Sequence, residues 1–566
     1  MFSLIRKSAR PFVLVSLAFL LATGFRVGAI TPSLPLAIVS NPLWSTFMGS
    51  ANPDYIEAVE VDASGNIYVA GYSSATWGVP VNPFSGSDDA FVAKLNNSGV
   101  RQWVTFLGGS GSDYAYGVAV DGNGNIYVAG TSDASWGSPL NAYAGGNEAW
   151  AAKLDGSGNR LWNTFMGQAG NDYAEGLDVD AGGNIYVTGY SSATWGSPLN
   201  GFAGGTYDAF AARLDPSGSR QWLTFMGGTG VDLARDLRVD GSGYVYVAGQ
   251  SNATWGSPRA AYTGGTDTFA VKLDGNGARQ WMTFMGGLEN DYGRGIAVDG
   301  SGNVYVAGYS TFGWGSPTVL YGGGTDGFAA KLNSNGDRQW NTFMGSIADD
   351  QALDIAADAG GNVYVTGTSP ASWGSPDIAY HGGQDAFMLP LTTNGARNKN
   401  IFLGSSTGDD YGNSVAVDAG GDVIVAGRSS ASWGTPLNAY AGNWDVFVTK
   451  FITQVPAAPV TLEPSGATIA IQPVYKWNAS SAASKYDLRV YLQGVVDPVV
   501  NSLNLNANAA CQGLICGNQP GVNLAVGTYS FQVRAGNDLG WSAWSPLQQF
   551  VVVEAPYKIY IPLIVR

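Results

Sequence analysis

One column of positions in this chain changes in chemical character while the sequence around it stays nearly constant. It holds two glutamates, two arginines, a tyrosine, a leucine and an asparagine: Glu57, Tyr116, Glu175, Arg235, Arg294, Leu353 and Asn413. We expect these residues just before the innermost strand of each sequence repeat, near the mouth of a central channel. Carboxylate and guanidinium groups bind polar ligands through charge-assisted hydrogen bonds. The column therefore predicts a ligand-binding site, with freely varying solvated surface as the alternative.

Few residues of the chain suit catalysis. His381 is the only histidine, so a Ser-His-Asp triad or a histidine-bound metal is not expected. A carboxylate pair such as Glu57 with Glu175 would suit glycoside cleavage, although spacing around a ring cannot be judged from sequence. We expect no catalytic residues, no metal and no cofactor, and a carboxylate-based glycosidase is the alternative.

The candidate residues recur because the chain itself is periodic. A fixed period is typical of repeat architectures. In the third period, strand signals occur at residues 177–180, 184–190, 208–214 and 220–227, joined by two tight turns and two long connections. Four antiparallel strands per period, without helical periodicity, predict the blades of a β-propeller. The period is marked by tryptophans 59 or 60 residues apart: Trp77, Trp136, Trp195, Trp255, Trp314, Trp373 and Trp433.

Antiparallel strand order predicts that the two tight turns lie at one end of the propeller and the two long connections at the other. The tight turns contain D-x-x-G, in which we expect the Asp to shape the turn rather than to bind calcium. The long connections carry the tryptophans, so Trp195 and Trp255 are candidate platforms for sugar stacking. The alternative is that each tryptophan packs back against its own blade, as aromatic side chains do in protein cores.

The strand count predicts how the ring closes. Residues 43–50 match the fourth strand of a period, whereas the last period ends with its third strand at residues 445–451. We therefore predict that the strand around Trp44 pairs with residues 445–451 and completes the last blade. Burying one tryptophan is worth about 4–6 kcal/mol before the entropy cost is subtracted.

The periodic part, residues 42–452, resembles the seven-bladed β-propeller repeats of the SBBP family, which occur in secreted and surface proteins of bacteria. The resemblance implies a closed ring of seven four-stranded blades that acts as a scaffold, with no assigned reaction. It depends on D-x-x-G-N-[IV]-Y-V-x-G segments, with looser copies at the last two positions of this series: Asp62, Asp121, Asp180, Asp299, Asp358, Asp240 and Asp418.

Composition agrees with an all-β protein and excludes some partners. Glycine makes up 80 of 566 residues, aromatic residues 12% and charged residues only 13%, about half the usual charged share. The formal net charge of −15 argues against nucleic acid or an anionic membrane surface, because both require clustered Lys and Arg. We expect a monomer, with an extracellular polysaccharide or a surface protein as partner.

The N-terminus predicts export. Arg6, Lys7 and Arg10 precede an apolar run at residues 11–24, which is short for a membrane span and fits a secretory signal. We assign residues 1–29 to a signal peptide and residues 30–41 to a linker, with a retained N-terminal anchor as the alternative. The mature protein is expected to be secreted or at the cell surface, with no transmembrane span after cleavage.

The period stops after residue 452. A Pro-rich linker (453–460) leads to residues 461–553, where strand signals begin near Val474, Tyr486, Gly527 and Leu547. This part resembles a fibronectin type III domain, an immunoglobulin-like β-sandwich, with Trp477 and Tyr486 as core aromatics. The apolar tail, residues 554–566, is either a terminal sorting tag or an edge strand.

Cys511 and Cys516 are the only cysteines. An exported chain favours a disulfide between them, and a pair of inert thiols is the alternative.

Together these features predict an exported, non-enzymatic scaffold or binding protein of the cell surface or extracellular space. A carbohydrate-binding lectin or a glycoside-active enzyme that uses the aromatic loops is the alternative.

Overall fold

A computed structural model of the chain describes residues 41–453, 458–468, 470–480, 483–537 and 540–554. The expected signal peptide, most of the two linkers and residues 555–566 of the tail lie outside the described residues. Within them the regular structure is β, apart from the short helix α1 (Ala507–Ala510). None of the helical structure in these ranges has the length and apolar character needed to cross a membrane.

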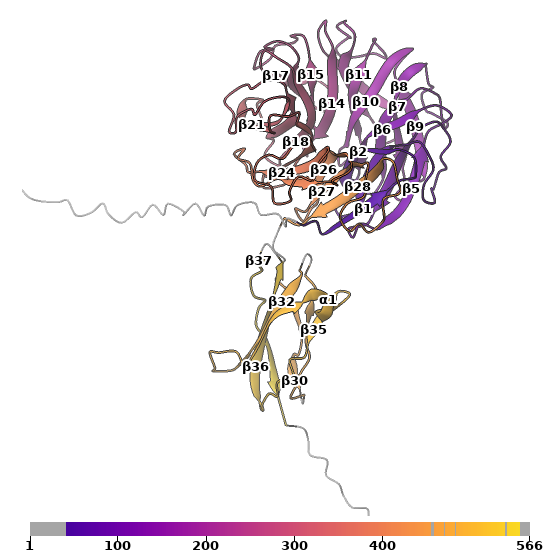
Figure 1. The fold of residues 1–566 in the computed structure, drawn as a ribbon. Helices are drawn as coiled ribbons and strands as arrows, with labels where there is room; N and C mark the ends of the chain where they lie inside the picture. The colour runs from indigo at the N-terminus through magenta and orange to yellow at the C-terminus, as the bar shows by residue number, and fades with distance from the viewer. Residues whose placement is uncertain (1–40, 454–457, 469, 481–482, 538–539, 555–566) are drawn as a thin grey trace, which may run out of the picture. The chain divides into compact units, whose positions relative to one another are not determined.

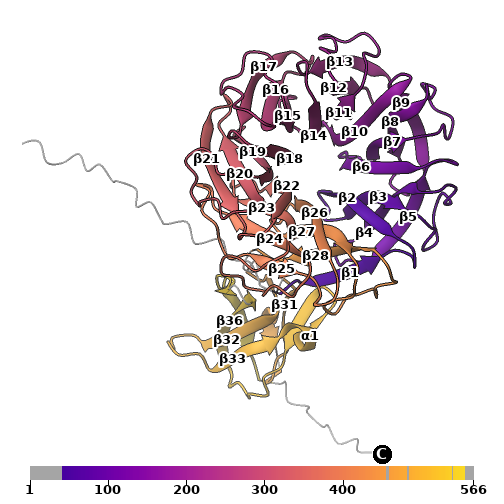
Figure 2. The same ribbon diagram turned by 45° about the horizontal axis from the view of Figure 1, so that its top comes forward.

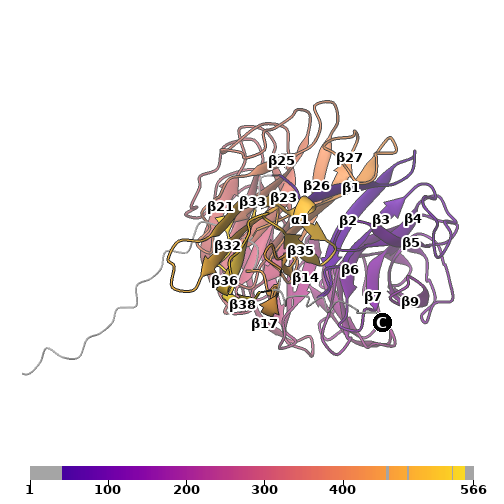
Figure 3. The same cartoon turned by 90° about the horizontal axis from the view of Figure 1, so that it is seen from below.

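Four-stranded antiparallel units repeat around a central channel, drawn in indigo to orange in Figure 1 and seen along the channel in Figure 2. Within each unit except the last, the strands lie side by side in chain order, as β2 to β5 do in Figure 3. The innermost strands contact one another in order around the channel, and β26 contacts β2, so the ring is closed. The innermost strands are β2 (Asp54–Val61), β6 (Asp113–Val120), β10 (Gly170–Val179), β14 (Asp232–Val239), β18 (Asp291–Val298), β22 (Gln351–Ala357) and β26 (Asp410–Val417).

Three further strands complete each unit. The second strands are β3 (Ile67–Ser73), β7 (Ile126–Ser132), β11 (Ile185–Ser191), β15 (Val245–Ser251), β19 (Val304–Ser310), β23 (Val363–Ser369) and β27 (Val423–Ser429). The third strands are β4 (Asp89–Leu95), β8 (Gly146–Leu154), β12 (Asp208–Leu214), β16 (Asp267–Leu273), β20 (Asp326–Leu332), β24 (Asp385–Leu391) and β28 (Asp445–Phe451). The outer strands are β5 (Arg101–Leu107), β9 (Arg160–Met166), β13 (Arg220–Met226), β17 (Arg279–Met285), β21 (Arg338–Met344), β25 (Ile401–Leu403) and β1 (Trp44–Met48). A short parallel pairing of Gly146 and Asn147 with Gly170 and Asn171 joins the units β6–β9 and β10–β13 into one eight-stranded sheet.

The predicted closure of the ring is confirmed. The N-terminal strand β1 pairs antiparallel with β28, with Trp44 opposite Lys450 and Met48 opposite Val446. The indole Nε1 of Trp44 also donates to the carbonyl of Asn97 in the following unit, at 3.1 Å. The outer strand of the last unit therefore comes from the opposite end of the ring's sequence.

The ring has two different ends, as antiparallel order predicts. One end, the turn face, carries tight turns such as residues 62–66. There Asp62 Oδ1 accepts from the backbone N–H groups of Ser64 and Asn66 at 2.9 Å, and Gly65 has a φ of 77°, which confirms the turn-forming role of the Asp. The other end, the loop face, carries the long connections, which contact one another where Asp88 bridges to Ser112.

The apolar core lies between neighbouring units. In β11 every residue except Tyr190 is buried, because the unit is packed between two others. Tyr186 and Ala211 of one unit share a core cluster with Leu237 and Phe269 of the next. Each unit therefore depends on its neighbours for burial of its apolar faces, which is the physical reason for closing the ring.

Pairs of buried carboxyl groups lie at the loop face, one from a third strand and one from the next innermost strand. A Cβ atom added to Gly286 would lie 2.8 Å from Asp267 Oδ1 and 2.6 Å from Asp291 Oδ2. Because both oxygens lie this close to one point, the two carboxyl groups are near neighbours. Burial raises the pKa of Asp291 to about 7. In the equivalent pair of Asp385 with Asp410, burial raises the pKa of Asp410 to about 7. These pairs therefore retain protons at a pH where a free Asp has lost them.

We expect the ring to lose stability as the pH rises from 5 to 8. A carboxyl group whose pKa is raised by folding binds its proton more tightly in the folded chain, so its protonated form favours folding. This contribution is complete below the unfolded pKa of about 3.9. For Asp291 it is lost as the pH rises through its folded pKa of about 7. A tenfold change in the proton affinity of one group corresponds to about 1.4 kcal/mol. Urea unfolding at both pH values measures the difference. Asp291→Asn should reduce it and the exposed Asp337→Asn should not, and equal stability at pH 5 and pH 8 would contradict the expectation.

The C-terminal part, drawn in yellow in Figure 1, consists of two sheets that share one apolar core. The predicted strands and both core aromatics are confirmed, because Trp477 and Tyr486 are buried with their ring centroids 5.4 Å apart. The disulfide between Cys511 and Cys516 is also present. One sheet contains β29 (Thr461–Glu463), β31 (Tyr475–Asn478), β35 (Ile515–Asn518) and β34 (Cys511–Gln512), and the other contains β30 (Gly466–Thr468), β38 (Gln548–Val552), β36 (Gly527–Asn537), β32 (Lys485–Leu492), β33 (Val500–Asn506) and β37 (Gly540–Trp541).

Candidate functional site

Each innermost strand contains a β-bulge, and the variable column occupies it. In β2 the pairing with β3 shifts between Ile56 and Ala58, so that Glu57 is the extra residue. A bulge re-aims a side chain and is common beside functional sites. We call the set of bulge residues, which all line one cavity in the channel, the bulge ring: Glu57, Tyr116, Glu175, Arg235, Arg294, Leu353 and Asn413.

A glycine in the second strand of each unit makes room for the bulge. A Cβ atom on Gly189 would lie 1.8 Å from the carbonyl oxygen of Tyr173, which is far inside contact distance. The same approach, at 1.8–2.0 Å, recurs in every unit, so the G of the repeated Y-V-x-G segment has a steric cause. The other glycines of this set are Gly71, Gly130, Gly249, Gly308, Gly367 and Gly427.

The structure corrects the predicted place of the column. These residues are expected from sequence before the innermost strand, at the mouth of the channel, but they lie within the strand and inside the channel. The first strand of the third unit begins at Gly170, not at Leu177. The bulge between Ala174 and Gly176 shifts the inward and outward alternation by one residue, which hides the first half of the strand.

The bulge ring surrounds a cavity of about 160 Å³, which we call the chamber. Glu175 and Arg235 form an ion pair there, with Oε1 and Nη1 3.1 Å apart. Glu57 accepts a long hydrogen bond of 3.4 Å from the side-chain amide of Asn413. Burial raises the pKa of Glu57 to about 7, although the positive charge of Arg428 lowers it. The chamber is therefore a desolvated site that carries charges of both signs.

Aromatic residues at the loop face hold the two arginines in place, and the sequence-based expectations do not include them. Arg294 Nη2 donates to the hydroxyl of Tyr309 at 2.9 Å and its guanidinium lies 5.3 Å from the ring centroid. The guanidinium of Arg235 lies 5.4 Å from the ring of Tyr190. Tyr190 and Tyr309 occupy the same position of their second strands, where the other units have Tyr, Thr, Gln or Arg. The same comparison between copies that isolates the bulge ring would show this second variable column.

Towards the turn face, acidic side chains connect neighbouring units. Asp178 Oδ2 accepts from the N–H of Val239 at 2.8 Å, and Asp236 Oδ2 accepts from the N–H of Ile296 at 3.0 Å. Arg238 donates to Asp236 Oδ1 at 2.9 Å. These carboxylates satisfy backbone groups across the joints between units, so their role is structural.

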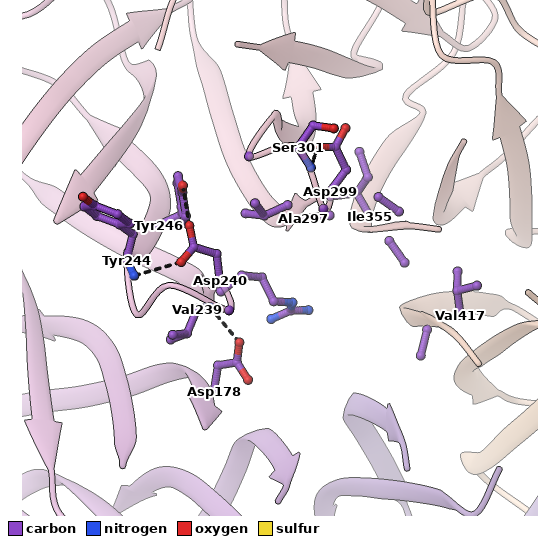
Figure 4. Close-up of a pocket in the computed structure, with 18 of the residues that line it drawn as sticks. Asp178, Val239, Asp240, Tyr244, Tyr246, Ala297, Asp299, Ser301, Ile355 and Val417 are labelled. Carbon is purple, nitrogen blue, oxygen red and sulfur yellow. Dashed lines mark hydrogen bonds between the residues drawn. The ribbon is translucent and has the colours of Figure 1, made fainter. Parts of the chain in front are cut away.

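A wider cavity of about 750 Å³ opens at the turn face beyond Arg238 (Figure 4). Ala297, Ile355 and Val417 line one side of it. On the other side the polar groups are bonded within the protein, as in the hydrogen bonds from the Tyr244 N–H and the Tyr246 hydroxyl to Asp240. This wider cavity therefore offers a ligand fewer unsatisfied polar groups than the chamber does.

The expected sugar-stacking role of Trp195 and Trp255 is wrong. Their exposed fractions are 1% and 6%, so neither indole has a free face. The indole ring of Trp195 lies 5.4 Å from the ring of Phe210, and the guanidinium of Arg220 lies 5.1 Å from the centroid of the same indole. Each tryptophan packs back against its own unit, which was the alternative expectation.

Trp195→Ala is expected to destabilise the ring by about 3–5 kcal/mol, because a fully buried aromatic side chain leaves a cavity that rigid strands do not fill. Denaturant unfolding of the variant measures the loss. Leu199→Ala, in the same connection but 58% exposed, is the control and should change stability by less than about 0.5 kcal/mol. A variant with wild-type stability would contradict the packing role.

Other candidates for catalysis are weak. His381 Nδ1 lies 3.3 Å from Asp385 Oδ2 in a long connection at the loop face. Across the residues that the structure describes, no group of three or more His, Cys, Asp or Glu side chains is arranged to hold a metal ion.

Comparison with known proteins supports the repeat architecture. Residues 102–135 and 280–313 match the SBBP beta-propeller repeat family. With these repeats and its four-stranded antiparallel units, the chain is a β-propeller repeat protein.

The chain also matches two curated proteins at low sequence identity. The chain is 24% identical over 430 residues to the uncharacterized WD repeat-containing protein L264 of Acanthamoeba polyphaga mimivirus, covering 58% of this chain and 30% of that protein. It is 26% identical over 457 residues to the regulatory protein FlaEY of Caulobacter vibrioides, covering 74% of this chain and 45% of that protein. The chain thus spans less than half the length of these relatives. Among solved structures, YCF48 bound to D1 peptide shares 9% identity and a TM-score of 0.36, covering 75% of this chain and 100% of that chain.

Proposed function

We propose that this chain is an exported, non-enzymatic binding protein whose seven-bladed propeller holds a small polar ligand in the chamber. The bulge ring carries this proposal, because a bulge in every unit turns one variable side chain to the same level of the channel. Several polar atoms there are buried without a hydrogen-bond partner in the described chain: Arg235 Nε, Arg294 Nε and Asn413 Oδ1. Each such atom costs roughly 1–3 kcal/mol, which a polar ligand would offset.

The remaining parts fit this role. We propose that the C-terminal sandwich is a fibronectin type III-like spacer or adhesion module, and that the N-terminal segment directs export to the cell surface or beyond. The disulfide between Cys511 and Cys516 supports export, since such bonds persist in oxidising compartments. An extracellular polysaccharide or a surface protein is the proposed larger partner.

A thermal-shift screen tests the binding function. The full chain is screened against separate sets of amino acids, sugars, nucleosides, polyamines and organic acids. At least one set should raise the melting temperature of the wild type and have a reduced effect on Glu57→Gln and Arg294→Gln. Arg259→Gln, which removes an exposed ion pair with Asp337 outside the channel, is the control and should respond as the wild type does. No shift with any set would overturn the proposal.

A second candidate function is glycoside cleavage, which Glu57 and Glu175 favour. Both line the chamber. Arg235 pairs with Glu175, while burial raises the pKa of Glu57 to about 7. A carboxyl group with a raised pKa beside a second carboxyl group is the pairing that glycosidases use. Release of reducing ends from polysaccharides by the wild type, with at least a 100-fold loss in Glu57→Gln and Glu175→Gln, would support an enzyme. No release by the wild type would exclude this activity on the substrates used.

A further inference from the structure

The charges of the bulge ring are not evenly distributed. In ring order the acidic residues lie on β2 and β10, and the basic residues lie on the neighbouring strands β14 and β18. Glu175 and Arg235 neutralise each other through their ion pair. Glu57 and Arg294 remain, and among the described residues neither has an ion-pair partner. Because β2 and β18 are separated by two strands in one direction and three in the other, these two charges face the chamber from opposite sides.

Both unpaired charges are held in position by neutral neighbours. Asn413 donates to Glu57 at 3.4 Å, and Tyr309 accepts from Arg294 at 2.9 Å. Neither neighbour supplies an opposite charge. The positive charge of Arg428 acts on Glu57 without forming an ion pair with it, and Arg294 Nε is buried without a partner in the described chain. A charge held in a desolvated site without a counter-charge in direct contact is costly. A ligand that brings a positive group to Glu57 and a negative group to Arg294 would offset both costs.

The size of the chamber restricts the ligand. A site needs about 10–15 Å³ of such volume for one water, so about 160 Å³ corresponds to on the order of ten waters. This is room for a molecule of roughly ten non-hydrogen atoms. Tyr116 and Leu353 add an aromatic and an aliphatic surface between the charged positions. The chamber therefore suits a compact dipolar molecule with a small neutral side group better than a sugar chain.

We propose that the chamber binds a small zwitterion of the α-amino-acid class, with its ammonium group at Glu57 and its carboxylate at Arg294. This inference rests on the proposed binding function and specifies its ligand. A simple cation would leave Arg294 without a counter-charge, and a simple anion would do the same to Glu57. A ligand with both charges satisfies the two sides together.

Isothermal titration of the full chain with neutral L-amino acids tests the proposal. The matched controls are their N-acetyl derivatives, which lack the ammonium group, and their amides, which lack the carboxylate. We expect at least one amino acid to bind, and both of its derivatives to bind at least 10-fold more weakly. These comparisons use the wild-type protein, so they do not depend on the folding of a variant.

The variants then assign the two ends of the ligand. Glu57→Gln should weaken the amino acid at least 10-fold but leave the weaker N-acetyl derivative nearly unchanged, and Arg294→Gln should leave the amide nearly unchanged. Arg259→Gln should bind as the wild type does. Equal affinity for the amino acid and both derivatives would overturn the zwitterion. Binding of sugars, nucleosides, polyamines or organic acids without amino acids would overturn it too, but would leave the binding function standing, whereas no binding in any set would overturn both.

Discussion

Removing strand β1 is expected to open the ring and lower its melting temperature by about 10 °C. A chain that begins at residue 51 lacks the partner of β28 and loses the burial of Trp44, Phe47 and Met48. These three side chains are together worth about 7–12 kcal/mol before entropy is subtracted. Trp44 and Met48 belong to one core cluster and Phe47 to another, so the loss reaches two joints between units.

A chain that begins at residue 41 keeps β1 and is the matched control. It should melt as the full chain does, whereas the chain from residue 51 should melt earlier and be cut faster by protease near β26–β28. Adding a synthetic peptide of residues 42–50 should restore part of the stability, because β1 is held to β28 by non-covalent pairing. Equal melting and equal protease resistance of the two shortened chains would show that closure by β1 does not stabilise the ring.

Gly189→Ala is expected to destabilise the protein by about 3 kcal/mol, at the upper end of overpacking costs, and to weaken the proposed binding in the chamber. The new Cβ would lie 1.8 Å from the carbonyl oxygen of Tyr173, and a backbone atom inside a sheet cannot rotate away as a side chain can. Strand β10 must therefore move away from β11 at the bulge, next to Glu175. The substitution should thus disturb the chamber although Gly189 does not line it.

Urea unfolding and ligand titration measure the two effects. Gly201→Ala is the matched control, because a Cβ at Gly201 would meet nothing within 4 Å and should leave both stability and binding unchanged. If Gly189→Ala kept stability to within about 1 kcal/mol of the wild type, the steric account of the Y-V-x-G glycine would be wrong. A loss of stability without any change in binding would show that the position of the bulge does not affect the chamber.

Much of the fold can be predicted from local sequence. The second strands are placed to within a residue, because short apolar runs between turn residues mark them clearly. The pairing of Trp44 with the last unit follows from counting strands. The turn role of Asp62 also follows from local chemistry, since its hydrogen bonds reach no further than Tyr68, six residues along the chain.

The first half of each innermost strand escapes prediction, since the bulge breaks the period-2 pattern on which strand prediction depends. Burial of the loop tryptophans cannot be settled from sequence either. An indole in a long connection packs inward only if the unit presents a fitting surface, and for Trp195 that surface is formed by Phe210 and Phe225. These partners are 15 and 30 residues away in sequence.

Local sequence is enough to predict the repeat, most of the strands, the turns and the identity of the variable column, because each of these depends on neighbours along the chain or on comparison between copies. What the column does depends on how the chain folds in space. Glu57 and Arg294 are 237 residues apart in sequence, and they line one chamber because the ring closes and each strand bulges at the same level. Whether Glu57 and Arg294 can act on one ligand depends on the distance between them in space, and the closure of the ring sets that distance.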